Sequence, residues 1–251
     1  MRPLPALPTP TVMAAALAAL AVLASGTGAA LAARSPGGSP GRTSAARDSV
    51  WVLETAVGTI AVQLFPADAP RTVENVRRLA NTGYYDGLTF HRVAPGFVVQ
   101  GGDPNSRDEN PFNDGQGGPG WTLPAEIKRT HTRGAVAMAR RGDQENPARE
   151  SNGSQFYIAL RDLPQLDGAY TVFGQVLSGW DTVEKLVQLA NRTDIARQGN
   201  NANPGTHALI RRTRLEPIAR WKGRTATAVR LPPRESAKRP APDSTARDSA
   251  R

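Results

Sequence analysis

The 251-residue chain contains no cysteine, and only 6% of its residues are aromatic. Without a thiol the protein can form no disulfide, and no thiolate can act as a nucleophile or as a metal ligand. Its histidines, His91, His131 and His207, lie far apart in the sequence and have no partners at metal-ligand spacing. The sequence therefore predicts neither a bound metal nor another cofactor.

The central part of the chain also lacks an excess of charge of either sign, although the formal net charge of the whole chain is +9. Residues 49–217 carry 18 basic and 18 acidic side chains, so the excess lies in the two flanks. A nucleic-acid interface needs basic residues gathered on one folded surface. We therefore expect no nucleic-acid partner, and we keep a weak contact of the basic tail with polyanions or the cell envelope as an alternative.

An uninterrupted apolar run long enough to cross a bilayer, about 20 residues, is missing as well. Arg2 precedes a shorter apolar stretch, 12–23, and Ala30-Leu31-Ala32 follows as a small-x-small cleavage site. This pattern is typical of a signal peptide, here 1–32, that is removed on export to the periplasm or the extracellular space. An uncleaved membrane anchor is the alternative.

Composition divides the rest of the chain into three parts. Residues 33–48 are rich in Ser, Gly, Pro and Arg, which is typical of a flexible linker. Residues 49–217 have the periodic apolar pattern of one folded domain. Residues 218–251 are rich in Pro, Arg and Ala without such periodicity, so we expect a disordered basic tail.

Within residues 49–217, short strand patterns separated by Gly, Pro and Asn outnumber helical ones. Alternating apolar residues predict strands at 50–55, 59–64 and 209–215, and apolar residues at helical spacing predict a helix from Asp68 or Pro70 to about Asn81. A second helix is expected to open at Asp181, with Glu184 completing a capping box. The loop 103–121 is longer than a hairpin needs, which favours a functional role. Many short strands with two helices indicate an antiparallel β-barrel.

The segment 90–103 places Arg92, Phe97 and Gln100 at fixed spacing before a glycine pair. It contains no nucleophile with a base beside it. A permanent cation, apolar walls and amide side chains suit a reaction in which no covalent bond breaks. Rotation about a prolyl peptide bond, with its barrier of about 18–20 kcal/mol, is such a reaction.

Other segments support the same interpretation. Two of them precede this segment, 53–60 and 70–75, and three follow it, 134–139, 151–158 and 166–174. Together they resemble the cyclophilin family of peptidyl-prolyl isomerases, from about residue 50 to about 215. The resemblance implies a closed eight-stranded antiparallel β-barrel capped by two α-helices. It also implies a monomeric isomerase of X-Pro bonds that assists the folding of proline-containing polypeptides, and the N-terminus suggests a bacterial, exported member. A non-catalytic module or chaperone that binds proline-containing segments is the alternative.

The same resemblance assigns roles to individual residues. Arg92 would be catalytic, donating a hydrogen bond near the prolyl nitrogen as the peptide bond twists. The substrate-binding residues would be Phe97, Gln100, Met138, Ala139, Gln155, Tyr157, Leu166, Tyr170 and His91.

Phe97, Met138, Tyr157 and Leu166 would form the prolyl pocket, although Leu166 could equally belong to the barrel core. Gln100 and Gln155 would hold the substrate backbone through their amides, and Ala139 would contact it. Tyr157 and Tyr170 replace the phenylalanine and histidine that are commoner at these positions, and the Tyr157 hydroxyl needs a partner.

Strand alternation sends the His91 side chain away from Arg92. We therefore expect a structural hydrogen-bonding residue, with a general base as the alternative. Arg140 and Arg141 either favour acidic peptides or are solvated.

Overall fold

The computed structural model describes residues 49–108, 110–192, 196–198 and 201–221. The predicted signal peptide, the linker and residues 222–251 of the predicted tail lie outside the described residues. The first four residues of that tail, Ile218–Trp221, form the 3-10 helix η4, and the Trp221 Nε1–H donates to Glu216 at 2.9 Å. Ile218 and Trp221 pack on Val50, Val52 and Ala61, so the folded domain extends four residues beyond the predicted boundary.

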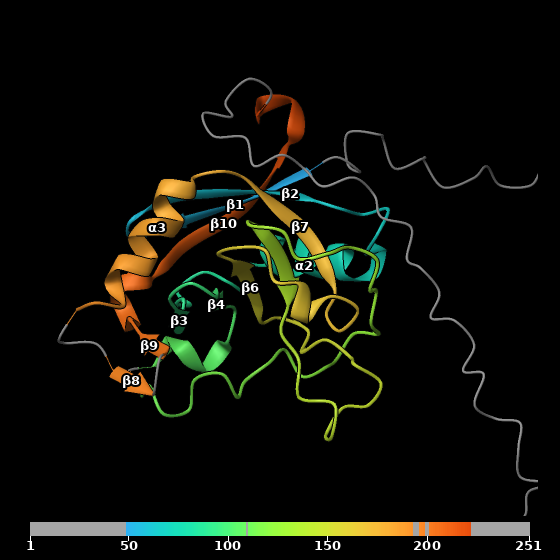
Figure 1. Cartoon of the computed structure of the whole chain (residues 1–251). Coiled ribbons are helices and arrows are strands. Elements are labelled where there is room, and N and C mark those ends of the chain that lie inside the picture. The colour runs from blue at the N-terminus through green and yellow to red at the C-terminus, as the bar shows by residue number, and fades with distance from the viewer. Residues whose placement is uncertain (1–48, 109, 193–195, 199–200, 222–251) are drawn as a thin grey trace, which may run out of the picture. The chain divides into compact units, whose positions relative to one another are not determined.

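Ten strands form one antiparallel sheet in the order β10-β1-β2-β7-β5-β6-β4-β3-β9-β8 (Figure 1). Its strands are β1 (Ser49–Thr55), β2 (Gly58–Leu64), β3 (Arg92–Ala94), β4 (Val98–Gly101), β5 (Ala135–Met138), β6 (Phe156–Ala159), β7 (Val172–Ser178), β8 (Ala196–Gln198), β9 (Asn201–Asn203) and β10 (Ile210–Pro217). The predicted β1–β2 hairpin and the predicted closing strand are thereby confirmed.

The prediction of a closed eight-stranded barrel is not confirmed, because β10 and β8 remain as edges of the sheet. The hairpin β8–β9 pairs with β3 through Val93 and Ala202 and so occupies that edge. Between the segments 88–90 and 208–210 there is an isolated bridge, with the Phe90 N–H donating to the Ala208 carbonyl at 3.0 Å. The Ile210 N–H also donates to the Leu88 carbonyl at 2.7 Å, so the sheet is curled and the chain before β3 meets the chain before β10.

Two α-helices accompany the sheet. The helix α2 (Pro70–Asn81) has proline in its first turn, as predicted, and buries Val73 and Val76. The helix α3 (Trp180–Leu189) begins one residue before the expected start, after Gly179 in a left-handed conformation with φ of 88°. Glu184 accepts a hydrogen bond from the Trp180 indole at 2.9 Å, so the predicted capping box is wrong. Among the described residues, no helix has the length and apolar character needed to cross a bilayer.

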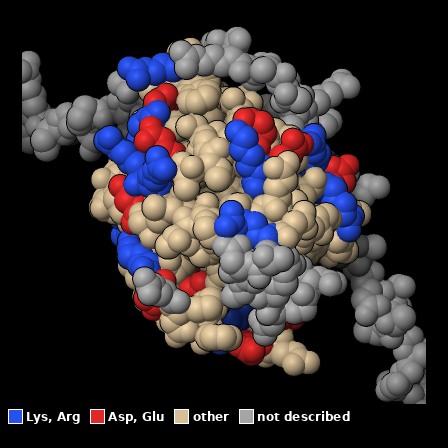
Figure 2. Space-filling model, turned by 90° about the vertical axis from the view of Figure 1, so that its left-hand side faces the viewer, with Lys and Arg blue, Asp and Glu red and all other residues tan. Residues whose placement is uncertain are grey.

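Short 3-10 helices occupy three of the connections: η1 (Pro104–Arg107), η2 (Pro164–Leu166) and η3 (Gly205–Ala208). On the face shown in Figure 2, basic and acidic side chains are intermingled among uncharged residues. This distribution agrees with the equal numbers of acidic and basic residues between 49 and 217.

Besides the cluster of Val50, Val52 and Ala61, the side chains of the sheet form two larger apolar clusters on opposite faces. The larger cluster surrounds Trp51, whose ring centroid lies 4.8 Å from that of Phe156, and includes residues of both helices. The smaller cluster contains Val98, Ala137 and Tyr157, with Phe97, Leu166 and Tyr170 packed against it. Because successive residues of a strand point to opposite faces, β4, β5 and β6 contribute to both clusters, and the candidate site lies on the smaller one.

Candidate active site

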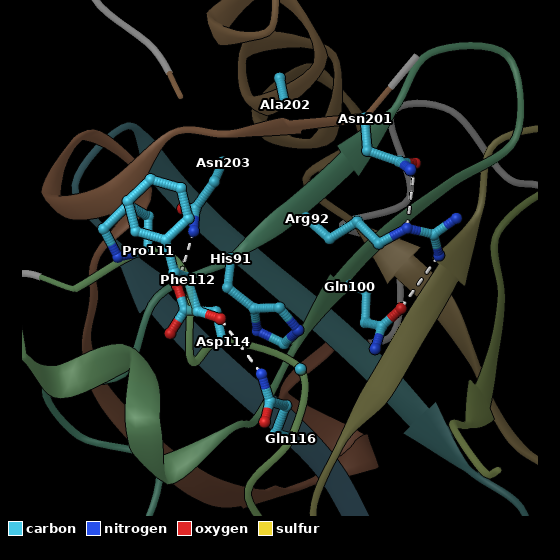
Figure 3. Close-up of a pocket in the computed structure, with 11 residues that line it drawn as sticks. His91, Arg92, Gln100, Pro111, Phe112, Asp114, Gln116, Asn201, Ala202 and Asn203 are labelled. Atoms are coloured by element: carbon cyan, nitrogen blue, oxygen red, sulfur yellow. Dashed lines mark hydrogen bonds between the residues drawn. The ribbon is translucent and has the colours of Figure 1, made fainter. Parts of the chain in front are cut away.

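Arg92 is the first residue of β3, and its half-buried guanidinium is held from two sides. Its Nε–H donates to the Asn201 Oδ1 at 3.0 Å, and its Nη1–H donates to the Gln100 Oε1 at 3.0 Å (Figure 3). Burial lowers the pKa of Arg92, but an arginine remains charged at neutral pH. The two bonds therefore fix the plane of a permanent cation.

Two glutamines continue this network away from the arginine. The Gln100 amide nitrogen donates to the Gln155 Oε1 at 2.9 Å, and the Gln155 amide nitrogen donates to the Gly117 carbonyl at 2.8 Å. Gln155 is only 2% exposed, so it supports Gln100 from behind. The chain of donors fixes both amide orientations and, through Gln100, the orientation of Arg92.

A cavity of about 150 Å³ opens beside the guanidinium, and we call it the Arg92 cavity. It has room for one small ring, since a water molecule takes up about 30 Å³ of liquid. The structure brings together seven of the predicted site residues around it. Its lining consists of Arg92, Phe97, Val98, Gln100, Ala139, Arg140, Tyr157, Leu166 and Tyr170.

A family model described as cyclophilin type peptidyl-prolyl cis-trans isomerase/CLD matches residues 50–213. The chain belongs to this family. It is 47% identical to a peptidyl-prolyl cis-trans isomerase of Synechococcus elongatus over 49% of this chain and 77% of that protein. It is 45% identical to peptidyl-prolyl cis-trans isomerase B of Bacillus subtilis over 51% of this chain and 82% of that protein.

The fold agrees with the family assignment. A cyclophilin type peptidyl-prolyl cis-trans isomerase of Cryptosporidium parvum matches with a TM-score of 0.54 and 27% identity, over 67% of this chain and 97% of that chain. The protein is thus an enzyme, a cyclophilin-type rotamase. Its described residues contain no group of three or more His, Cys, Asp or Glu side chains that could hold a metal ion.

Three predicted residues, Met138, Gln155 and His91, do not line the Arg92 cavity of this cyclophilin. Met138 is 1% exposed and belongs to the larger cluster, because its neighbours on the other face of the strand, Ala137 and Ala139, belong to the smaller cluster, and Ala139 lines the cavity. The predicted place of Met138 beneath the prolyl ring is therefore wrong. Val98 faces the cavity instead, and its spacing of two from Gln100 in one strand would have revealed it. Gln155 lies behind the cavity.

Arg140 was also missed as a wall of the cavity. Its side chain is 5% exposed, and its Nε–H donates to the Ala169 carbonyl at 2.7 Å. The guanidinium carbon lies 4.5 Å from the Tyr170 ring centroid. Arg140 is therefore a structural support for Tyr170, whereas Arg141 is 73% exposed and pairs with Glu145 at 2.9 Å.

The Tyr157 hydroxyl finds its partner outside the cavity, in a buried chain of polar groups. It lies 2.9 Å from the His131 Nε2, and the His131 Nδ1 lies 2.8 Å from the Asp167 Oδ1. Burial lowers the pKa of His131, although Asp167 opposes this effect. In the neutral ring, Nδ1–H donates to Asp167, so Nε2 accepts from Tyr157. His131, which is isolated in sequence, therefore anchors a wall of the cavity.

His91 lies on the other side of β3, as alternation predicts, and is 4% exposed. Burial lowers its pKa to about 4, and the charge of Arg92 also lowers it. The Asp103 carboxylate and the Thr89 backbone have the opposite effect, because they favour the charged form. The Thr89 backbone lies close to the ring, but neither ring nitrogen meets hydrogen-bond distance and angle with a described residue. A neutral ring outside the Arg92 cavity is a poor candidate for a base.

Proposed function

We propose that this isomerase accelerates rotation about X-Pro bonds by binding the proline ring in the Arg92 cavity. The observation that carries the proposal is the fixed guanidinium at the edge of a cavity of about 150 Å³, whose apolar walls are Phe97, Val98 and Leu166. A second Cryptosporidium parvum cyclophilin structure, solved in the presence of the dipeptide Ala-Pro, matches with a TM-score of 0.51 and 28% identity. That relative supports proline-containing polypeptides as substrates.

The chemistry follows from the change in the prolyl nitrogen during rotation. In the planar peptide its lone pair is delocalised and accepts a hydrogen bond poorly. In the twisted state the lone pair is localised, so a donor such as the Arg92 guanidinium binds it more strongly. An interaction that strengthens towards the transition state lowers the barrier, and holding the donor in advance avoids the cost of reorienting it.

The test compares two substitutions in a peptide isomerisation assay. Arg92→Ala is expected to lower kcat/KM by about 10²- to 10³-fold, the loss typical of one transition-state donor. Arg141→Ala is the matched control, because it removes an exposed arginine side chain of the same charge that does not line the cavity. Thermal unfolding checks that both variants are folded. A folded Arg92→Ala protein with full activity would overturn the role of Arg92, and a wild-type protein that binds prolyl peptides without accelerating them would be a binding module.

We further propose that the enzyme is a bacterial protein that works after export, on clients outside the cytoplasm. The support is the pattern of a charged start, an apolar stretch and the small-x-small triplet Ala30-Leu31-Ala32. Mass spectrometry of the protein made in a bacterial host tests this. A product that begins after Ala32 in the exported fraction agrees with export, and a cytoplasmic product that retains residues 1–32 contradicts it.

A further inference from the structure

A second, larger cavity of about 390 Å³ adjoins the Arg92 cavity, and we call it the Asp114 cavity. It lies between the loop 111–116 and β9, and Arg92 and Gln100 belong to the walls of both cavities (Figure 3). Its volume is within the range of small-molecule sites. Apart from Asn201, which holds Arg92, its other residues have no part in the isomerisation step described above.

Asp114 provides an acceptor without a donor in this cavity. Its Oδ2 accepts from the Asn203 amide at 2.6 Å, whereas its buried Oδ1 has no partner within the described part of the chain. Burial raises the pKa of Asp114, and the charges of Asp103 and Asp108 add to this effect. A carboxylate in this position is stabilised by a cationic donor.

His91 adds a second acceptor. Its ring points into the space bordered by Asp114, Gln116 and Gln100 (Figure 3), with neither nitrogen hydrogen-bonded to a described residue. With a pKa of about 4 the ring is neutral at physiological pH, so one nitrogen presents a lone pair. Buried polar groups are normally satisfied, and a ligand with several donors would satisfy both His91 and Asp114.

The charges around the cavity favour a cation. Asp114 carries the only negative charge among the described lining residues, and Asp103 is fully buried nearby. Arg92 carries the opposing positive charge, but Asn201 and Gln100 accept two of its N–H groups. The carboxylates of Asp103 and Asp108 add to the negative potential at Asp114.

The remaining wall is apolar and open. Phe112 is 86% exposed, which is unusual for a large aromatic side chain, and Pro111 and Ala202 are the other apolar residues of the lining. Lysine and arginine combine an aliphatic stem with a cationic head that has three or five donors. Such a side chain can place its stem against Phe112 and its head against Asp114 and His91.

We propose that the Asp114 cavity binds a lysine or arginine side chain of the polypeptide whose proline occupies the Arg92 cavity. The shared wall makes this possible for one chain, because a peptide leaving the Arg92 cavity past Arg92 and Gln100 enters the Asp114 cavity. The enzyme then selects prolyl bonds that lie near a basic residue. This inference rests on the proposed function and adds a substrate class to it.

The test is a positional scan of short prolyl peptides with one lysine placed in turn at each position from three before the proline to three after it. Each peptide is compared with its norleucine and glutamate versions, so that stem length and charge are separated. At one position, lysine is expected to raise kcat/KM about tenfold over norleucine, as for a partly exposed charge-assisted hydrogen bond. Glutamate at that position is expected to give a lower kcat/KM than norleucine.

Two substitutions assign the effect. Asp114→Asn keeps an acceptor for Asn203 and removes the charge, so the lysine-to-norleucine ratio should fall to about one. Asp181→Asn is the matched control, since it removes an exposed carboxylate of α3 and should keep the wild-type ratio. A further measurement needs no variant: in the wild-type protein, ¹³C NMR of the Asp114 carboxyl should show a lower pKa when the lysine peptide is bound.

Four results are decisive. If the wild-type enzyme isomerises prolyl peptides without preferring lysine at any position, the basic-residue site is refuted and the proposed function stands. A lysine preference that survives in folded Asp114→Asn also refutes the site, as does a preference for glutamate, which would assign the cavity to anions. If no peptide is isomerised at all, the proposed function itself fails.

Discussion

His91 makes the stability of the domain depend on pH in a calculable way. The ring is 4% exposed, and desolvation lowers its pKa to about 4 despite the nearby Asp103 carboxylate. An unfolded histidine titrates near pH 6.5. Well above pH 6.5 the ring is neutral in both states and contributes no pH dependence.

Below pH 6.5 the His91 ring is protonated in the unfolded chain but stays neutral in the folded protein, so unfolding becomes more favourable. Each pH unit between about 6.5 and 4 costs about 1.4 kcal/mol for this one group. The free energy of unfolding should therefore fall by about 2 kcal/mol between pH 6.5 and 5, and by about 3 kcal/mol by pH 4. For a domain of this size, 2 kcal/mol corresponds to about 4–8 °C in Tm.

The assay is a series of thermal melts of wild-type protein and His91→Phe between pH 7 and pH 4.5. The substitution keeps a planar ring and removes the titrating group, and every other group, including His131, is common to both proteins. The difference in Tm should therefore be constant above pH 6.5 and should shift by about 4–8 °C in favour of His91→Phe by pH 5. Parallel curves over the whole range would refute the assignment of a neutral, buried His91.

Two further substitutions test the packing that supports the site. Tyr157→Phe leaves the buried His131 Nε2 without its partner at 2.9 Å and should lower the free energy of unfolding by about 1–3 kcal/mol in urea titrations; an unchanged midpoint would mean that another donor reaches this nitrogen. Gly179→Ala adds a methyl group 3.0 Å from the Ile60 Cα at a φ of 88°, whereas Gly87→Ala adds one at a φ of 82° with open space around it. Gly87→Ala should lower the free energy of unfolding by about 1–2 kcal/mol, and Gly179→Ala should lower it clearly more. Equal losses in the two variants would contradict the close approach of the backbones at Gly179.

Local patterns in the sequence predicted much of the fold. Alternation in 50–64 gave the β1–β2 hairpin, and the apolar spacing after Pro70 gave α2. The helix α3 shows the limit of such reasoning. Its start depends on Gly179, whose backbone lies against Thr59 and Ile60 of β2, and a capping pattern contains no information about that contact.

The candidate site divides in the same way. The residue types around Arg92 predicted a site of one permanent cation with apolar walls and amide side chains. The sequence blocks that resemble the cyclophilin family predicted the reaction. Strand register decided which side chains face the cavity: it placed Met138 in the larger apolar cluster and Val98 in the wall of the Arg92 cavity.

Tertiary structure alone decided the contacts between distant segments. Arg92 meets Asn201 across 109 positions, and His131 meets Tyr157 and Asp167, because separate strands and loops converge there. The Asp114 cavity has the same origin, since the loop 111–116 and β9 form it only when both are folded against β3. The sequence by itself determined the elements and the chemistry of the Arg92 segment, because these depend on neighbouring residues. The folded chain determined the partners and the second cavity, because they depend on residues that are neighbours only in space.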